Sequence, residues 1–273
     1  MVDEDYLNRA AAAITQVRGV RAVVLGGSRA RGTHTEASDF DIGVYYDDGE
    51  LDTDALELLA RQDSDGQVSL ARPGGWGPWV DGGAWLSVRG SRVDWILRST
   101  SRVRDQCRRA VRGEFAFHRQ PGHPLGFLDV SYAGEVALCR PLADPHGFVR
   151  ALKAGLDPYP DRLRTAFADR LWEADFLLDG AEKGASRSDV AFVSLSCSAA
   201  AMICAHAWHA AAGSWVVNEK DLVPAVARLP LDTGEFVELI NEALSTLGTT
   251  EQALLDAIRR TRRAVAYSVG RLA

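Results

Sequence analysis

The pattern of apolar residues changes near residue 145, and this change constrains the fold more than any other feature of the chain. Before it, short apolar runs that indicate strands alternate with segments of helical periodicity. After it, helical patterns follow one another with almost no strand pattern. We therefore predict an α+β protein with two domains: residues 1–145 form a mixed β-sheet flanked by helices, and residues 146–273 form an α-helical bundle.

The predicted elements follow from the spacing of apolar residues and from the Gly and Pro residues that interrupt it. In the first domain we expect helices over residues 3–17 and 52–61, strands over 21–25, 39–46, 67–71 and 92–98, and a loop rich in Gly, Pro and Trp over 72–83. In the second we expect helices over 148–156, 161–183, 189–212, 222–228, 234–247 and 250–270.

Charge and composition exclude several classes of protein. The chain has 31 Lys and Arg against 37 Asp and Glu, a net charge of −6, so we expect no nucleic-acid partner, with tRNA left open through a local basic cleft. We expect no membrane span, and the acidic start is unlike a secretory signal, so we expect a cytoplasmic protein. Four cysteines without a C-x-x-C pair fit neither a disulfide scaffold nor a zinc ribbon.

One stretch combines residue types that carry chemistry. The strand over 21–25 runs into Gly26, Gly27 and Ser28 and then a short helix, a turn that lets a phosphate approach the backbone. Asp39 and Asp41 are two residues apart on the next strand and so point to one face, where Asp94 of a neighbouring strand can join them. Three crowded carboxylates repel one another unless a cation lies between them, and they suit Mg²⁺.

This arrangement resembles the DNA polymerase β-like nucleotidyltransferase superfamily over about residues 20–98. The resemblance implies that residues 1–145 are a nucleotidyltransferase domain in which Asp39, Asp41 and Asp94 hold two Mg²⁺ ions. It also implies that a nucleoside triphosphate, expected to be ATP, is the donor substrate. Its phosphates would lie against the turn that contains Gly27, Ser28 and Arg31.

A second resemblance lies in the helical half. The stretch from Trp208 to Asp221, with Arg228, Leu229 and Pro230 beyond it, is similar to the helical domain of bacterial streptomycin/spectinomycin adenylyltransferases. In those enzymes a lysine at this place meets the nucleotide triphosphate. The resemblance implies that Lys220, one of only three lysines in the chain, does the same.

The sequence does not single out a general base for the acceptor hydroxyl. Glu135 is our choice, as some antibiotic nucleotidyltransferases use a glutamate beyond the third aspartate, and Asp94, Glu114, His118 and His123 stay open. Three tryptophans of the Gly-rich region form either a lid or ordinary packing: Trp76, Trp79 and Trp85. The pair His206 and His209 is expected in the core rather than on a metal.

These observations and resemblances together predict a Mg²⁺-dependent nucleotidyltransferase. It would move AMP from ATP to a hydroxyl of a small-molecule acceptor, such as an aminoglycoside-like antibiotic, and release pyrophosphate. Two alternatives stay open: a nucleotidyltransferase that modifies a protein or a tRNA, as toxin and antitoxin members of the superfamily do, and a non-catalytic nucleotide-binding module. The protein is expected to be a monomer or a homodimer.

Overall fold

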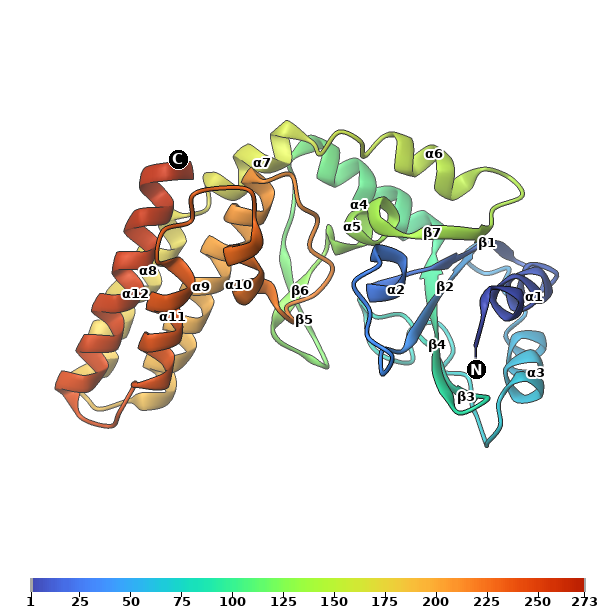
Figure 1. Ribbon diagram of the computed structural model, residues 1–273, viewed down its shortest axis with the longest axis horizontal. Helices are drawn as coiled ribbons and strands as arrows, with labels where there is room; N and C mark the ends of the chain where they lie inside the picture. The colour runs from blue at the N-terminus through green and yellow to red at the C-terminus, as the bar shows by residue number, and fades with distance from the viewer. Residues whose placement is uncertain (1, 273) are drawn as a thin grey trace. The chain divides into compact units, whose positions relative to one another are not determined.

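The computed structural model describes residues 2–272, and the chain divides into two compact units (Figure 1). The first unit comprises the residues up to Val111 together with Phe115–Pro158, and the second comprises Arg112–Glu114 and the residues from Tyr159 onward. The first unit thus extends beyond residue 145, where we placed the domain boundary. The added segment contains α6 (Phe148–Ala154), whose Lys153 Nζ donates to the backbone carbonyls of Ala137, at 2.5 Å, and Cys139, at 2.8 Å.

A five-stranded mixed sheet organises the first unit, with strand order β3-β4-β2-β1-β7. The central pair, β2 and β4, is parallel, and the other neighbouring pairs are antiparallel. The strands are β1 (Val20–Leu25), β2 (Phe40–Tyr46), β3 (Gly83–Val88), β4 (Ser91–Ser99) and β7 (Arg140–Ala143). With the helical second unit, this sheet confirms the predicted α+β fold class.

One buried apolar cluster of the first unit lies on one face of the sheet, and part of the other face is covered as well, since Val24 and Tyr45 there are also buried. Alternate residues of β2 and β4, among them Ile42, Val44, Val93 and Leu97, are fully buried in this cluster. Two helices contribute to the same apolar core: α1 (Glu4–Thr15), through Leu7, Ala11 and Ile14, and α3 (Thr53–Asp63), through Leu56 and Ala60. Because side chains of a strand alternate between faces, the residues between these core positions project from the opposite face.

Several elements of the first unit differ from the prediction. The expected strand at 67–71 is reduced to a single bridge between Ala71 and Gly83. The structure adds β3 and β7 to the sheet, and places a separate β-hairpin and two helices where we predicted no element. These are β5 (Phe117–Gln120) and β6 (His123–Leu128), with α4 (Thr100–Arg112) and α5 (Ser131–Leu138); the short helix expected after β1 is α2 (Gly27–Arg31). These strands are short and contain or adjoin Gly and Pro, so local periodicity does not reveal them.

The second unit is helical from Tyr159 onward. Its elements are α7 (Asp161–Ala168), α8 (Trp172–Ala185), α9 (Val190–Ala211), α10 (Leu222–Ala225), a 3₁₀ turn η1 (Val226–Arg228), α11 (Phe236–Ser245) and α12 (Glu251–Leu272). The long helix α9 contacts α7, α8, α11 and α12, so it is the core helix of this unit. The four cysteines, Cys107, Cys139, Cys197 and Cys204, are buried and free, as expected for a chain without a disulfide framework.

Helix α9 corrects one sequence expectation. It is 22 residues long, and its most apolar stretch has a mean hydropathy of 1.8, so it is long and apolar enough to cross a membrane. We had expected no such segment. Small residues such as Ala200 and Ala205 make its sequence apolar without bulk. Because 56% of this stretch is buried within the protein, α9 also has the features of a core helix.

The burial of His206 on α9 predicts acid sensitivity. This side chain is 4% exposed, its ring stacks on Phe167 with centroids 5.7 Å apart, and burial, with the nearby His209, lowers its pKa from 6.5 to about 3. Below pH 6.5 the His206 side chain is protonated in the unfolded chain but stays neutral in the folded chain. The contribution of neutral His206 to the free energy of unfolding is therefore fully present above pH 6.5 and is lost as the pH falls toward 3. Urea unfolding should show a loss of about 2 kcal/mol between pH 7.5 and pH 5 from this residue. The His206→Asn variant should lose that much less, and an equal loss in both proteins would contradict the assignment.

Candidate active site

Two of the three predicted metal-binding aspartates are direct neighbours in the sheet. In the parallel pairing of β2 with β4, Asp41 lies opposite Asp94, at a strand spacing of about 4.8 Å. Both residues alternate with the buried core positions and so project from the face opposite the core. Asp39 precedes the first residue of β2, two positions before Asp41. Alternation therefore places all three residues on one face of the central strands.

The pKa of Asp94 depends on the charges of the other two carboxylates. The pKa of Asp94 is raised to about 6 by burial and by the negative charges of Asp41 and Asp39, while Arg92 opposes the shift. Burial is the larger cause, and the part that comes from the like charges of Asp41 and Asp39 is what a cation would relieve. Carboxylate oxygens are also the ligands that Mg²⁺ prefers, so the donor set fits a divalent cation.

Two arginines that the sequence analysis did not single out hold the segment around Asp39. Arg29 of α2 donates from Nη2 to the carbonyl of Ser38 at 2.8 Å and from Nε to that of Asp39 at 3.3 Å, and its guanidinium lies 3.6 Å from the centre of the Phe40 ring. Arg92 Nε lies 3.0 Å from Asp39 Oδ1. Arg29 therefore fixes the backbone at the start of β2, and Arg92 holds the Asp39 side chain.

The three aspartate side chains do not form a complete set of metal ligands in the structure. Within residues 2–272, no group of three or more His, Cys, Asp or Glu side chains is close enough to hold a metal ion. Repulsion between the carboxylates and the Arg92–Asp39 ion pair both oppose such a cluster when no cation balances the charge. The backbone register thus sets the positions of the three aspartates, and their carboxylates would have to converge for a cation to bind.

The turn after β1 packs directly against Asp41. The Gly26 N–H donates to the Asp41 carbonyl at 2.7 Å. Gly27 has a left-handed φ of +60°, and a Cβ there would lie 2.8 Å from Asp41 Cγ and nearer still to Oδ2. Glycine at 27 is therefore required both by the backbone and by the space that Asp41 occupies. The start of α2, with Ser28 half-buried, is in this way contiguous with the aspartate face.

The two predicted basic contacts to phosphate lie in different units. Arg31, at the end of α2, is exposed, and its Nε donates to the Gly27 carbonyl at 3.2 Å, so it belongs to the same turn. Lys220 is exposed in the second unit, where its backbone N–H donates to Asn218 Oδ1 at 2.9 Å. Its contact with phosphates bound in the first unit stays a prediction.

Glu135 is engaged in an ion pair that disfavours its predicted role as general base. Both of its carboxylate oxygens accept from the guanidinium of Arg98, at 2.6 Å each, and the Arg98 side chain is 6% exposed. A bidentate pair of this kind holds both partners in place and ties up the oxygens that a base needs. The ion pair joins α5 to β4, and the role of Glu135 as general base stays a prediction.

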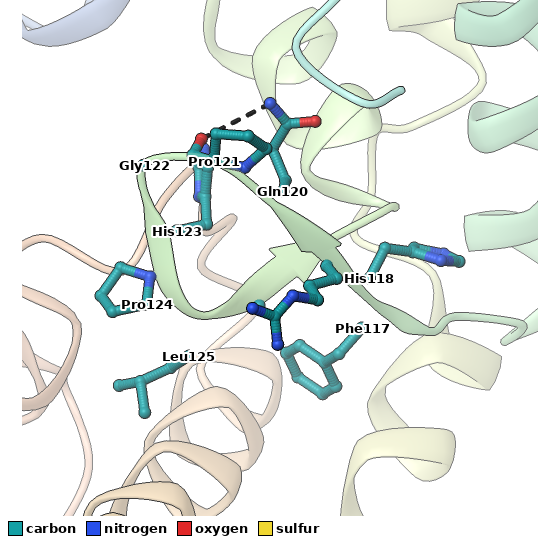
Figure 2. A pocket seen from close by; sticks show the side chains of 10 residues that line it. Phe117, His118, Gln120, Pro121, Gly122, His123, Pro124 and Leu125 are labelled. Atoms are coloured by element: carbon teal, nitrogen blue, oxygen red, sulfur yellow. Dashed lines mark hydrogen bonds between the residues drawn. The ribbon is translucent and has the colours of Figure 1, made fainter. Parts of the chain in front are cut away.

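Of the other base candidates, Asp94 lies on β4, and Glu114, His118 and His123 lie in the β5–β6 hairpin or a few residues before it. His118 Nε2 lies 3.2 Å from the buried Asp129 Oδ2, and its ring stacks on Trp79 at 3.9 Å. Glu114 pairs with Arg112 at 2.8 Å. Residues 117–126 of the hairpin line a cavity of about 790 Å³ (Figure 2). Figure 2 shows the turn end of the hairpin, with Gln120 and His123 at the ends of the two strands.

The three tryptophans occupy different elements. Trp85 lies on β3, just beyond the loop expected over 72–83, and it stacks on Trp76 with ring centres 4.6 Å apart. Trp79 stacks on His118. The loop before β3 is tied to the hairpin by Gln120, whose side-chain Oε1 accepts from the backbone N–H groups of Trp79 and Val80 at 2.9 and 3.2 Å.

One comparison with known proteins bears on the class of this domain. Residues 8–71 match the sequence profile of the nucleotidyltransferase domain, a stretch that includes Gly27, Ser28, Asp39 and Asp41 and ends before Asp94. The match covers less than half of the chain. It shows that this part of the first unit is similar to a nucleotidyltransferase domain, for which nucleotidyl transfer is the general reaction.

Two further comparisons add little about the function. Among the curated proteins, none matches this chain. A solved structure described as a nucleotidyltransferase-like protein from Exiguobacterium sibiricum is similar over 98% of this chain and 77% of its own length, with 12% sequence identity and a TM-score of 0.48.

The raised pKa of Asp94 predicts that this carboxylate destabilises the metal-free protein. Its folded pKa of about 6 exceeds the unfolded value of 3.8, so the cost of ionisation is absent below pH 3.8 and complete above pH 6. Because the group is half-buried, we discount the full shift and expect Asp94→Asn to stabilise the protein in EDTA by about 1–2 kcal/mol at pH 7.5. Urea unfolding should show this gain shrinking toward pH 4. A gain that does not depend on pH would contradict the electrostatic cause.

Proposed function

We propose that the protein is a Mg²⁺-dependent nucleotidyltransferase that moves AMP from ATP to a hydroxyl of a small-molecule acceptor and releases pyrophosphate. The observation that carries this proposal is the register of β2 with β4, which sets Asp41 beside Asp94 on one face of the sheet. The Gly27 turn lies against the same aspartate, so a site for phosphate adjoins the site for the cation.

Each residue has a part in the proposed reaction. Asp39, Asp41 and Asp94 would hold Mg²⁺, which neutralises phosphate charge and acidifies the attacking hydroxyl when it is bound. The backbone at Gly27 and the Ser28 hydroxyl bind the triphosphate and orient it. Asp94 is the outer carboxylate, away from the turn, and it orients the acceptor hydroxyl and accepts its proton. The new bond joins the acceptor oxygen to the α-phosphorus as the bond to pyrophosphate breaks.

The acceptor is proposed from charge as well as from resemblance. The chain has a net charge of −6, which favours the approach of a cation, and a small ammonium-bearing alcohol of the aminoglycoside type satisfies this preference. Modification of such an antibiotic would give resistance to it. The choice of ATP over other nucleoside triphosphates rests on the resemblance alone.

Labelled nucleotides test this function. The purified protein is incubated with Mg²⁺, a small-molecule cell extract or an aminoglycoside panel, and ATP that carries the label at either the α- or the γ-phosphate. We expect the α-label on a small product and the γ-label in pyrophosphate. Transfer of the γ-label to the acceptor would contradict nucleotidyl transfer, and α-label on protein or tRNA would contradict the small acceptor. Nucleotide binding without any transfer would support a non-catalytic module.

A further inference from the structure

Trp85 stands beside the aspartates on the same face of the sheet. In the antiparallel pairing of β3 with β4, it lies directly opposite Asp94, and residues paired in this way project from one face. Its neighbours Ala84 and Leu86 are buried in the core on the other face. Trp85 is nevertheless 66% exposed, which is unusual for a side chain of this size on a sheet.

The exposed indole is held rigidly. It stacks on Trp76 with an angle of 17° between the rings. Trp76 is fixed through its backbone, since its carbonyl accepts from Gln120 Nε2 at 2.7 Å. Gly83 leaves room for the Trp76 ring, because a Cβ at this position would lie 2.8 Å from Trp76 Cη2. Because the rings stack face to face, Trp76 backs one face of the Trp85 indole and leaves the other face as a flat surface, which we call the Trp85 platform. A preorganised surface binds a ligand at a low cost in entropy.

The strand order indicates whether this surface lies on the side of the nucleotide or of the acceptor. Across the sheet, the Gly27 turn follows β1, the paired aspartates lie on β2 and β4, and the Trp85 platform lies on β3. The carboxylates therefore separate the turn from the platform. In an in-line displacement the entering and leaving groups lie on opposite sides of the phosphorus. With pyrophosphate leaving toward the turn, the acceptor enters from the side of β3.

We propose that the Trp85 platform is the acceptor subsite, on which a polyhydroxylated ring stacks while one of its hydroxyls faces Asp94. The indole surface packs against the apolar C–H face of such a ring, and the carboxylates accept hydrogen bonds from its hydroxyls. This proposal rests on the proposed function for its direction. The platform itself rests on the pairing of Trp85 with Asp94 and on the exposure of the indole. Trp85 acts as a positioning residue, because it fixes the ring that carries the reacting hydroxyl.

The test uses p-nitrophenyl β-D-glucopyranoside as the probe and the indole N–H signals of the full-length protein in NMR spectra. Trp85→Phe identifies the Trp85 signal by its loss and keeps an aromatic surface. Trp85→Ala removes the surface. Trp172→Ala is the matched control, because Trp172 of α8 is similarly exposed, at 62%, and lies in the second unit. Binding of Mg²⁺-ATP is measured in parallel by calorimetry.

We expect the probe to shift the Trp85 signal and leave that of Trp172 in place. Trp85→Ala should weaken probe binding roughly 5- to 150-fold, the usual loss for a stacking ring, and Trp85→Phe should recover most of it. In the labelled-ATP assay, Trp85→Ala should raise the KM for the acceptor and leave Mg²⁺-ATP binding unchanged.

Three results would overturn the proposal. They are a wild-type protein that does not bind the probe, a Trp85→Ala variant that binds it equally well, and a loss of Mg²⁺-ATP affinity in Trp85→Ala, which would show that the platform holds the donor base. The proposed function fails separately: if the wild-type protein binds the probe at Trp85 but never transfers the α-label, the platform stands and the reaction does not.

Discussion

Asp41→Asn is expected to lower nucleotidyl transfer by about three orders of magnitude or more, with little change in folding. Asparagine keeps the shape of the side chain but removes the charge that a shared cation needs. Asp41 lies at the centre of the site, paired with Asp94 on β4 and packed against the Gly27 turn, so no neighbouring carboxylate can take its place. The measurement is initial-rate transfer of α-label from ATP, together with calorimetric titration of Mg²⁺, in which binding should be lost.

The matched control for this variant is Asp54→Asn. Asp54 lies on α3 with its side chain 83% exposed, in an ion pair with Arg72. Such a surface pair contributes little to stability, so this variant should behave as the wild-type protein in both measurements. Normal turnover in Asp41→Asn would contradict the mechanism, as would an equal loss in both variants.

The second large effect is expected from a single methyl group at Gly27. In Gly27→Ala the new Cβ would overlap the Asp41 carboxylate. That carboxylate must turn away, because Asp41 is paired with β4 and its carbonyl accepts from the Gly26 N–H. A displacement of about 1 Å in a catalytic group is enough to cost about 100-fold in rate. We therefore expect a loss of at least this size in α-label transfer.

Gly32→Ala separates the steric effect from backbone strain. Gly32 has a φ of +69°, close to the +60° of Gly27, but a Cβ there meets nothing within 4 Å among the described residues. Both variants should lose about 1 kcal/mol of stability because alanine is strained at these angles. Only Gly27→Ala should lose activity. If Gly32→Ala is equally inactive, strain in the turn rather than contact with Asp41 explains the effect.

The sequence predicts the centre of the candidate site because its information is local. A strand that ends in Gly26 and Gly27, followed by a strand with aspartates two residues apart, specifies a turn and a common face without knowledge of the rest of the fold. The position of Asp94 also followed from strand periodicity. The sequence also proposes that its strand neighbours the strand of Asp41, and the family resemblance agrees with this. Neither predicts the register that sets Asp94 directly opposite Asp41.

The supporting contacts depend on pairings between distant segments, and the sequence does not reveal them. Arg29 and Arg92 are two among many arginines, and nothing nearby marks them as partners of the segment around Asp39. The ion pair between Arg98 and Glu135 joins β4 to α5, 37 residues apart. The strand that carries Trp85 is not predicted, because it is short and follows a run of glycines. In each case the contact is set by the packing of the whole unit.

A crystal structure with Mg²⁺ and a non-hydrolysable ATP analogue tests the central claim most directly. We predict Mg²⁺ bound by carboxylate oxygens of Asp39, Asp41 and Asp94 at about 2.1 Å, with the triphosphate against the turn at Gly27 and Ser28. In that complex the Asp39 carboxylate should either break its ion pair with Arg92 or contact both Arg92 and the metal. A nucleotide bound elsewhere, or a Mg²⁺ ion held without Asp41 and Asp94, would contradict the account.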